Sequence, residues 1–200
     1  MRIVIVDSGC ANLASIRIAV ERLGHAGEVI QDPAGLAAAD RVILPGVGAA
    51  PYALAQLRKR GFDEALKNVS VPTLGICLGM QLLVEGSDEH GGVDTLGLIP
   101  GRAEALTARP GFPVPHMGWN RLENISSDCR LLDDIPEGAS VYFVHSFAVP
   151  VNEFTVAKTM YGSVFSAVMQ RENFMGCQFH PEKSGRVGAC ILSNFLEGPC

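Results

Sequence analysis

The chain has no long apolar run. Its longest uncharged segment, Asn68 to Val84, includes Pro72 and Gln81 and falls short of the roughly 20 apolar residues that span a bilayer. The N-terminus reaches Asp7 after four apolar residues, too few for the apolar region of a secretory signal peptide. We therefore expect a soluble, cytoplasmic protein.

Basic residues are too few to attract a polyanion. The 200 residues include 16 lysines and arginines against 21 aspartates and glutamates, and the formal net charge is -5. The charges are spread along the chain, without a basic stripe for nucleic acid or an anionic membrane. The substrate is therefore expected to be a small molecule.

Closely spaced pairs of cysteines are absent as well. The six cysteines stand at positions 10, 77, 129, 177, 190 and 200, without the spacing of a zinc site or the density of a disulfide framework. Free thiols in a reducing cytosol fit this pattern best. We expect no metal site and no cofactor.

The first half of the chain alternates apolar, strand-like segments with helix-like ones. A strand at residues 2–6 is followed by a Ser8-Gly9 turn and a helix that Gly24 ends. Further strands are expected at 27–30, 42–44 and 72–76, and helices at 51–59 and 62–67. Such alternation predicts a parallel sheet covered on both faces.

The second half is richer in aromatic and β-branched residues, separated by glycine and proline. Antiparallel or edge strands are expected at 114–119, 140–147, 154–160, 164–170 and 174–179, and an amphipathic helix at 187–196. No repeat or linker interrupts the chain. The predicted fold class is therefore α/β, with residues 1–200 forming a single domain. This domain is a three-layer sandwich with a central, mostly parallel sheet, flanked by helices and extended by antiparallel strands.

The segment Gly75-Ile76-Cys77-Leu78-Gly79 lies between an apolar strand and a helix-like run at 80–84. Cys77 is therefore expected at a sharp turn from strand to helix, where glycines on either side leave room for the backbone. That position suits a nucleophile. A buried structural cysteine is the commoner fate of a cysteine in an apolar run. A second motif favours the nucleophile.

That motif is His180-Pro181-Glu182. Proline fixes its own φ and favours an extended residue before it, so we expect a strand-like tripeptide in which His180 and Glu182 share a face. Cys77 would then be the nucleophile, His180 the base and later the acid, and Glu182 the group that orients the imidazole. Alone, the motif would be an ordinary histidine beside a solvated glutamate.

Acyl transfer also needs hydrogen-bond donors for an oxyanion. The backbone N–H of Leu78 supplies one at the turn. The loop from Pro45 to Gly48 follows its own buried strand, and its glycines allow the N–H of Gly48 to turn toward the reacting carbon. Without Cys77, this loop would be a glycine turn with no role.

These motifs resemble those of class I, triad-type glutamine amidotransferases, whose marks are Gly-x-Cys-x-Gly and a distal His-Pro-Glu. The resemblance covers nearly the whole chain and is to one branch, the glutaminase subunits of imidazole glycerol phosphate synthase. It rests on residues 7–13, 44–48, 75–83, 115–120, 142–146 and 178–185. The most specific mark is His116-Met117-Gly118-Trp119-Asn120, because other branches share the triad without it.

The resemblance implies hydrolysis of glutamine to glutamate and ammonia through a γ-glutamyl thioester on Cys77. It also implies that glutamine is held by a set of residues from several loops. These are Gly46, Gly48, Gln81, Glu89 and the backbone around His145, Ser146 and Phe147.

A partner is implied as well. In this branch ammonia passes to a cyclase subunit, a (β/α)₈ barrel, which makes imidazole glycerol phosphate and an aminoimidazole carboxamide ribonucleotide in histidine biosynthesis. The two subunits would form a heterodimer, with Trp119, Tyr142 and Lys183 facing the cyclase and Asn12 near the path between the two sites. By themselves, a lone tryptophan would favour core packing and a lysine a solvated charge.

The residues also indicate a partner by a separate argument. Ammonia released to water is protonated and lost as a nucleophile, yet the chain has no GxGxxG motif and no P-loop for a second substrate. The acceptor is therefore expected on another chain. Two alternatives stay open: a paralogous amidotransferase that feeds another synthase, such as one for amino sugars, and an inactive regulatory module of the same fold.

Overall fold

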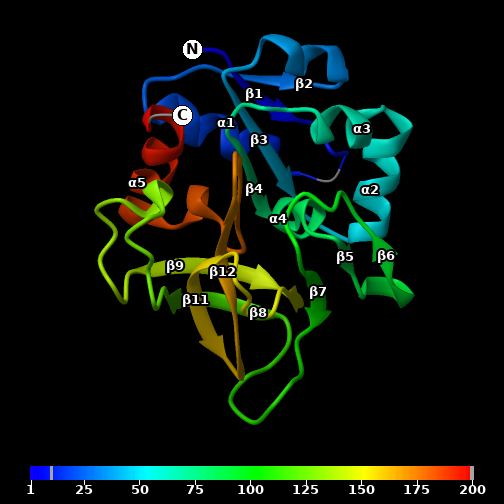
Figure 1. Ribbon diagram of the computed structural model, residues 1–200. Helices are drawn as coiled ribbons and strands as arrows, with labels where there is room; N and C mark the ends of the chain where they lie inside the picture. The colour runs from blue at the N-terminus through cyan, green and yellow to red at the C-terminus, as the bar shows by residue number, and fades with distance from the viewer. Residues whose placement is uncertain (10, 199–200) are drawn as a thin grey trace.

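In a computed structural model the protein is a three-layer α/β sandwich (Figure 1). The structure describes residues 1–9 and 11–198, so Cys10 and Cys200, expected as free thiols, lie outside the described residues. The central sheet has seven strands, in the order β11 (Thr155–Tyr161), β12 (Ser163–Arg171), β13 (Phe174–Cys177), β4 (Thr73–Cys77), β3 (Arg41–Gly46), β1 (Ile3–Val6) and β2 (Gly27–Ile30).

Five neighbouring strands of this sheet, from β13 to β2, run parallel to one another. β12 and β11 extend the sheet in antiparallel pairing. β13, expected among the antiparallel or edge segments, lies inside the sheet, because it pairs antiparallel with β12 and parallel with β4. The predicted fold class, a mostly parallel sheet with an antiparallel extension, is confirmed.

Helices cover both faces of the sheet (Figure 1). On one face lie α1 (Leu13–Arg22) and α5 (Gly185–Glu197), and on the other α2 (Ala50–Lys59), α3 (Phe62–Lys67) and α4 (Leu78–Leu83). Alternate residues of a strand point to opposite faces, so Ile5 shares a core with Ile16 of α1 and Val4 shares the other with Leu54 of α2. This is why β1, β3 and β4 are buried along their whole length.

The remaining strands form two smaller sheets. β8 (His116–Arg121) pairs antiparallel with β9 (Ser140–His145), and a four-stranded sheet has the order β10 (Phe147–Ala148), β7 (Arg102–Ala105), β5 (Gly86–Ser87) and β6 (Val93–Asp94). In Figure 1 both lie on the side to which the arrowheads of β3 and β4 point. The sequence indicated β8 and β9 but not β5, β6 and β7, which are short.

No helix within residues 1–9 and 11–198 is long and apolar enough to cross a membrane. Over the same part of the chain, Cys77, Cys129, Cys177 and Cys190 are free thiols. Burial raises the pKa of the Cys129 thiol to about 11 and that of the fully buried Cys177 well above its usual range. These two thiols stay protonated at neutral pH and are poor nucleophiles.

Candidate active site

Cys77 is the last residue of β4 and directly precedes α4. Its φ of 54° and ψ of -110° lie outside the regions that residues with a side chain usually adopt. A Cβ added at Gly79 would stand 1.7 Å from the carbonyl oxygen of Leu44 in β3, so only glycine lets α4 begin this close to the sheet. The predicted sharp turn at Cys77 is confirmed.

His180 and Glu182 form a buried pair beside this turn. Nδ1 of His180 is 2.8 Å from Oε1 of Glu182, and the two side chains are 4% and 3% exposed. The tripeptide is not strand-like, so our expectation was wrong in this respect: only His180 is extended, and Pro181–Lys183 form a 3₁₀ turn. The φ that proline fixes also suits the first position of a helical turn, and the turn carries Glu182 to the imidazole.

The surroundings of His180 favour its protonated form. Burial by itself lowers the pKa of His180, but the Cys77 side chain and the Glu182 carboxylate outweigh it and raise the pKa to about 9. Nδ1 donates to Glu182, so in the neutral tautomer Nε2 carries the lone pair. Nε2 is buried and has no hydrogen-bond partner among the described residues. Nε2 is therefore the nitrogen that exchanges a proton with a reacting group, and the raised pKa favours the state in which it carries that proton.

Cys77 and His180 line a cavity of about 350 Å³ at the carboxyl ends of β3 and β4. Ligands of open parallel sheets bind at this edge. The cavity is also lined by most of the residues that the resemblance assigned to the oxyanion or to glutamine: Gly48, Leu78, Gln81, Glu89, His145, Ser146 and Phe147.

Gly46 does not line this cavity. It is buried at the end of β3, where an added Cβ would stand 2.9 Å from the Cβ of Leu78. Together with Asn12, His180 and Glu182 it borders a narrow cleft of about 10 Å³ behind the imidazole. Two residues predicted for different roles, Gly46 for glutamine and Asn12 for communication with a partner, thus meet at one place.

Gln81 is held in the cavity wall by both hydrogens of its amide. Nε2 of Gln81 donates to the carbonyl of Phe147 at 2.9 Å and to Oε1 of Gln178 at 3.0 Å. A backbone carbonyl accepts hydrogen bonds but cannot donate one, so the orientation of the amide is set. Oε1 of Gln81 is then the atom that this side chain offers to a ligand.

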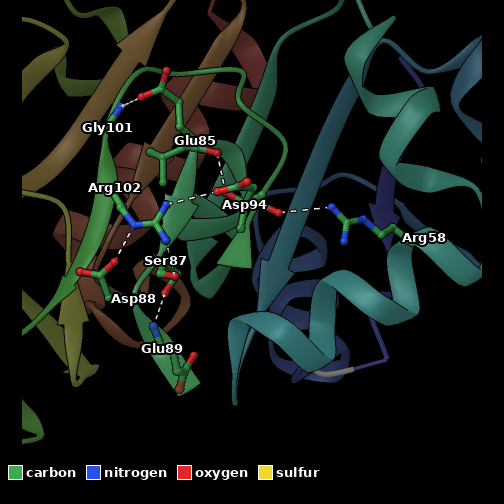
Figure 2. A network of polar contacts seen from close by, with 10 residues as sticks. Arg58, Glu85, Ser87, Asp88, Glu89, Asp94, Gly101 and Arg102 are labelled. Carbon is green, nitrogen blue, oxygen red and sulfur yellow. Dashed lines mark hydrogen bonds and ion pairs between the residues drawn. The ribbon is translucent and has the colours of Figure 1, made fainter. Parts of the chain in front are cut away.

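Glu89 lies in a loop that Arg102 fastens to β7 (Figure 2). Nε of Arg102 is 2.5 Å from Oδ1 of Asp88, and its Nη1 is 3.4 Å from Oδ1 of Asp94. These two carboxylates flank Glu89 in sequence, so one guanidinium holds both sides of the loop. An added Cβ at Gly86 would stand 2.2 Å from Nη1, so a larger residue there would displace the guanidinium.

The carboxylate of Glu89 also reaches the predicted oxyanion loop. Its Oε2 accepts a hydrogen bond from the backbone N–H of Ala50 at 2.6 Å, two residues after Gly48. Gly48 has a φ of 95°, which glycine adopts without strain. The Glu89 loop and the glycine loop are therefore connected on the same side of the cavity.

Three of the residues expected at an interface gather near the His180–Glu182 pair. Trp119 is 59% exposed, its ring meets that of Tyr142 edge-on at 6.0 Å, and Nζ of Lys183 is 6.0 Å from the centre of the Tyr142 ring. Core packing, which a lone tryptophan normally favours, does not hold for Trp119. Met117, two residues earlier in β8, is 66% exposed.

Two residues without a role predicted from the sequence lie in the surroundings of the site. Gln178 is fully buried, and its Nε2 is 3.7 Å from Sγ of Cys77. It directly follows β13, whose last residue pairs with Ile76 of β4, so the parallel pairing sets Gln178 beside Cys77. His116 is hydrogen-bonded to His145, 29 residues away, and no local sequence pattern predicts that contact.

Comparison with known proteins identifies the family. The family described as glutamine amidotransferase class-I matches residues 4–198. The protein named imidazole glycerol phosphate synthase subunit HisH from Yersinia pseudotuberculosis is 47% identical over 197 residues, which cover 98% of this chain and all of that protein. Its namesake from Xanthomonas campestris is 53% identical over 193 residues, 96% of each chain.

Solved structures of lower identity show the same fold. A crystal structure described as a glutamine amidotransferase has a TM-score of 0.73 at 17% identity, covering 97% of each chain. The structure of PurLQS from Thermotoga maritima has a TM-score of 0.69 at 19% identity, covering 98% of this chain and 97% of that one. The chain belongs to the class I glutamine amidotransferase family, within the branch of the HisH subunits of imidazole glycerol phosphate synthase.

Proposed function

We propose that Cys77 is the nucleophile with which this amidotransferase hydrolyses glutamine to glutamate and ammonia. One observation carries the proposal: Cys77 stands at a strained turn in the wall of a cavity, beside a histidine whose far nitrogen is held by a buried carboxylate. An inactive module would not need to keep this arrangement. The relatives are named as a subunit of imidazole glycerol phosphate synthase, and we propose that the ammonia serves this enzyme in histidine biosynthesis.

The proposed first step forms a thioester. With the thiol proton held on Nε2 of His180, the protonated form that the raised pKa favours, Sγ of Cys77 attacks the side-chain amide carbon of glutamine. The N–H groups of Leu78 and Gly48 stabilise the charge on the amide oxygen. His180 then returns the proton to the amide nitrogen, the C–N bond breaks, and ammonia leaves.

The second step releases glutamate. A water molecule gives a proton to His180 and attacks the thioester carbon, the C–S bond breaks, and the thiol of Cys77 is restored. Glu182 stabilises the imidazolium at both proton transfers, since its carboxylate already bonds Nδ1 at 2.8 Å.

The other end of glutamine would lie against acceptor atoms. The carboxylate of Glu89 and Oε1 of Gln81 both line the cavity, and neither can donate a hydrogen bond. An ammonium group has three donors and no acceptor, so we assign these two side chains to the α-ammonium of glutamine. Arg102 would then act on glutamine affinity through the Glu89 loop.

We propose that a cyclase subunit binds over Trp119, Tyr142 and Lys183. An exposed tryptophan beside a half-buried tyrosine and a cation is typical of binding surfaces, and Met117 extends the exposed apolar area. The cleft behind His180 lies by Asn12, on the route that ammonia would take toward this surface. We place both subunits in the cytoplasm, because free thiols fit a reducing compartment.

The test measures glutamate formation by the purified chain with and without the cyclase. We expect turnover to rise when the cyclase is added, to fall by several orders of magnitude in Cys77→Ala, and to persist in Cys190→Ala. Trp119→Ala should weaken binding of the cyclase while leaving the fold intact. Undiminished turnover by Cys77→Ala would exclude the proposed mechanism.

A further inference from the structure

A buried chain of hydrogen bonds joins strand β8 to the sulfur of Cys77. Four side chains carry it, and none is more than 6% exposed: His116, His145, Gln81 and Gln178. The carbonyl of Phe147 links the two histidines to the two glutamines. Buried polar groups are costly unless paired, so a continuous chain of this kind fixes the positions of all its members.

The histidine arm has a defined direction. Nδ1 of His145 is 2.8 Å from the carbonyl of Phe147, which can only accept, so Nδ1 carries the hydrogen. Nε2 of His145 therefore accepts from Nδ1 of His116 at 2.9 Å. Nε2 of His116 in turn accepts from Nδ2 of Asn120 at 3.4 Å. Each imidazole is a neutral ring in one tautomer.

The environment keeps these rings neutral. Burial lowers the pKa of His116 to about 4 and that of His145 to about 3. A proton on Nε2 of His145 would face the hydrogen on Nδ1 of His116 and break their bond. The direct contact between the rings is therefore stable at neutral pH.

The glutamine arm ends at the nucleophile. Gln81 donates to both the Phe147 carbonyl and Oε1 of Gln178, which turns the amide nitrogen of Gln178 toward Cys77. That nitrogen is 3.7 Å from Sγ of Cys77, and Sγ is also 3.7 Å from the carbonyl of Val144 in β9. The sulfur thus lies between an acceptor in β9 and a donor that is held, through Gln81, by the Phe147 carbonyl of β10.

The two faces of β8 carry different residues. His116 and Asn120 point inward, toward the hydrogen-bonded side chains, while Met117 and Trp119 point out from the exposed face. Alternate residues of a strand share a face, so any displacement of β8 moves both sets together. The histidine arm therefore begins on the strand that carries the proposed partner surface.

We propose that His116 and Gln178 are positioning residues that hold the Cys77 sulfur for attack, although neither lines the glutamine cavity. Gln178 acts on the sulfur directly, and His116 acts through His145, Phe147 and Gln81. The inference rests on the proposed function, since it takes Cys77 as the nucleophile.

Two substitutions at His116 separate hydrogen bonding from packing. The ring of His116 stacks on that of Tyr161 at 3.8 Å, so His116→Phe keeps the stacked ring and removes the donor. His116→Asn loses the ring but keeps an N–H near the place of Nδ1. With the cyclase present, His116→Phe should lose about tenfold or more in kcat, and His116→Asn should stay within a few-fold of wild type.

Gln178→Met tests the other end, because methionine has nearly the shape of glutamine without its hydrogen bonds. We expect kcat to fall about tenfold and KM to change less, since Gln81 loses one of its two hydrogen bonds but keeps the one to Phe147. Alkylation of Cys77 by iodoacetamide in the isolated chain should also slow, because the sulfur loses the donor that orients it. Gln170 is a partly buried glutamine of β12 that takes no part in these hydrogen bonds. Gln170→Met is therefore the matched control and should have wild-type kcat and a wild-type alkylation rate.

The results distinguish this inference from the proposed function. If wild type with the cyclase forms no glutamate, the proposed function fails, and the alkylation rates still decide the inference. If wild type is active and the kcat of His116→Phe is higher than that of His116→Asn, His116 serves only packing and the inference is overturned. The inference is also overturned if Gln178→Met has the same kcat and the same alkylation rate as wild type.

Discussion

Replacing Glu182 by glutamine isolates the charge that orients the catalytic histidine. The side chains of Glu182 and His180 are almost fully buried and joined at 2.8 Å. Oε1 of a glutamine could still accept from Nδ1, so the hydrogen bond survives while the negative charge is lost. The new amide nitrogen would take the place of Oε2, which has no partner among the described residues.

The size of the effect follows from this geometry. A hydrogen bond to a charged group contributes about 1.5–3 kcal/mol, most of it to the imidazolium that forms during the reaction. We therefore expect kcat to fall about 10- to 100-fold. The unpaired amide nitrogen should also lower the free energy of unfolding by about 1–3 kcal/mol. The pKa of His180 should drop below about 9, because the Glu182 carboxylate helps to raise it.

Glutamate formation at saturating glutamine gives kcat, and NMR titration of the histidine ring gives the pKa. The chain offers a matched control in His25 and Glu197, an exposed pair at 3.3 Å whose side chains are 23% and 59% exposed. Glu197→Gln should leave kcat unchanged, since water screens that pair. A folded Glu182→Gln protein with wild-type kcat and an unchanged His180 pKa would refute the assigned role.

Three further predictions concern other parts of the structure. Gly79→Ala should lower the thermal midpoint strongly or prevent folding, because its Cβ would meet the Leu44 carbonyl; a wild-type midpoint would contradict the geometry. Arg102→Met should raise KM for glutamine more than it lowers kcat, whereas Arg17→Met in the exposed pair with Glu21 should change neither. His116, with its pKa lowered to about 4, is protonated more readily in the unfolded chain below pH 6.5, so stability falls as pH drops through that range. Denaturant unfolding of wild type should therefore lose about 2 kcal/mol more between pH 7 and pH 5 than His116→Phe does, and equal losses would contradict the burial of a neutral ring.

The sequence predicted the fold because its strongest signals are local. Apolar runs such as Val42–Leu44 and the glycines around Cys77 follow from residues that are adjacent in the chain. The short strands β5 to β7 were not predicted, because they have no apolar period and are held by the side chain of Arg102. The pattern of residues adjacent in sequence does not predict a side-chain contact such as that of Arg102.

The site residues that belong to short sequence motifs could be predicted. Cys77 and His180 were found in this way, and the structure brings both to one cavity. The conformation at Pro181 was not, because proline suits both an extended segment and the start of a turn. Gln178 and His116 lacked an assigned role, since their partners are distant in sequence and buried.

Covalent trapping of the nucleophile tests the central claim most directly. The cyclase-bound protein is treated with an electrophilic glutamine analogue, and the modified cysteine is located by peptide mass spectrometry. The proposed mechanism predicts one label on Cys77, protection by excess glutamine, and loss of glutamate formation in proportion to labelling. A label confined to Cys190 or another cysteine, or labelling of Cys77 that leaves turnover intact, would contradict it.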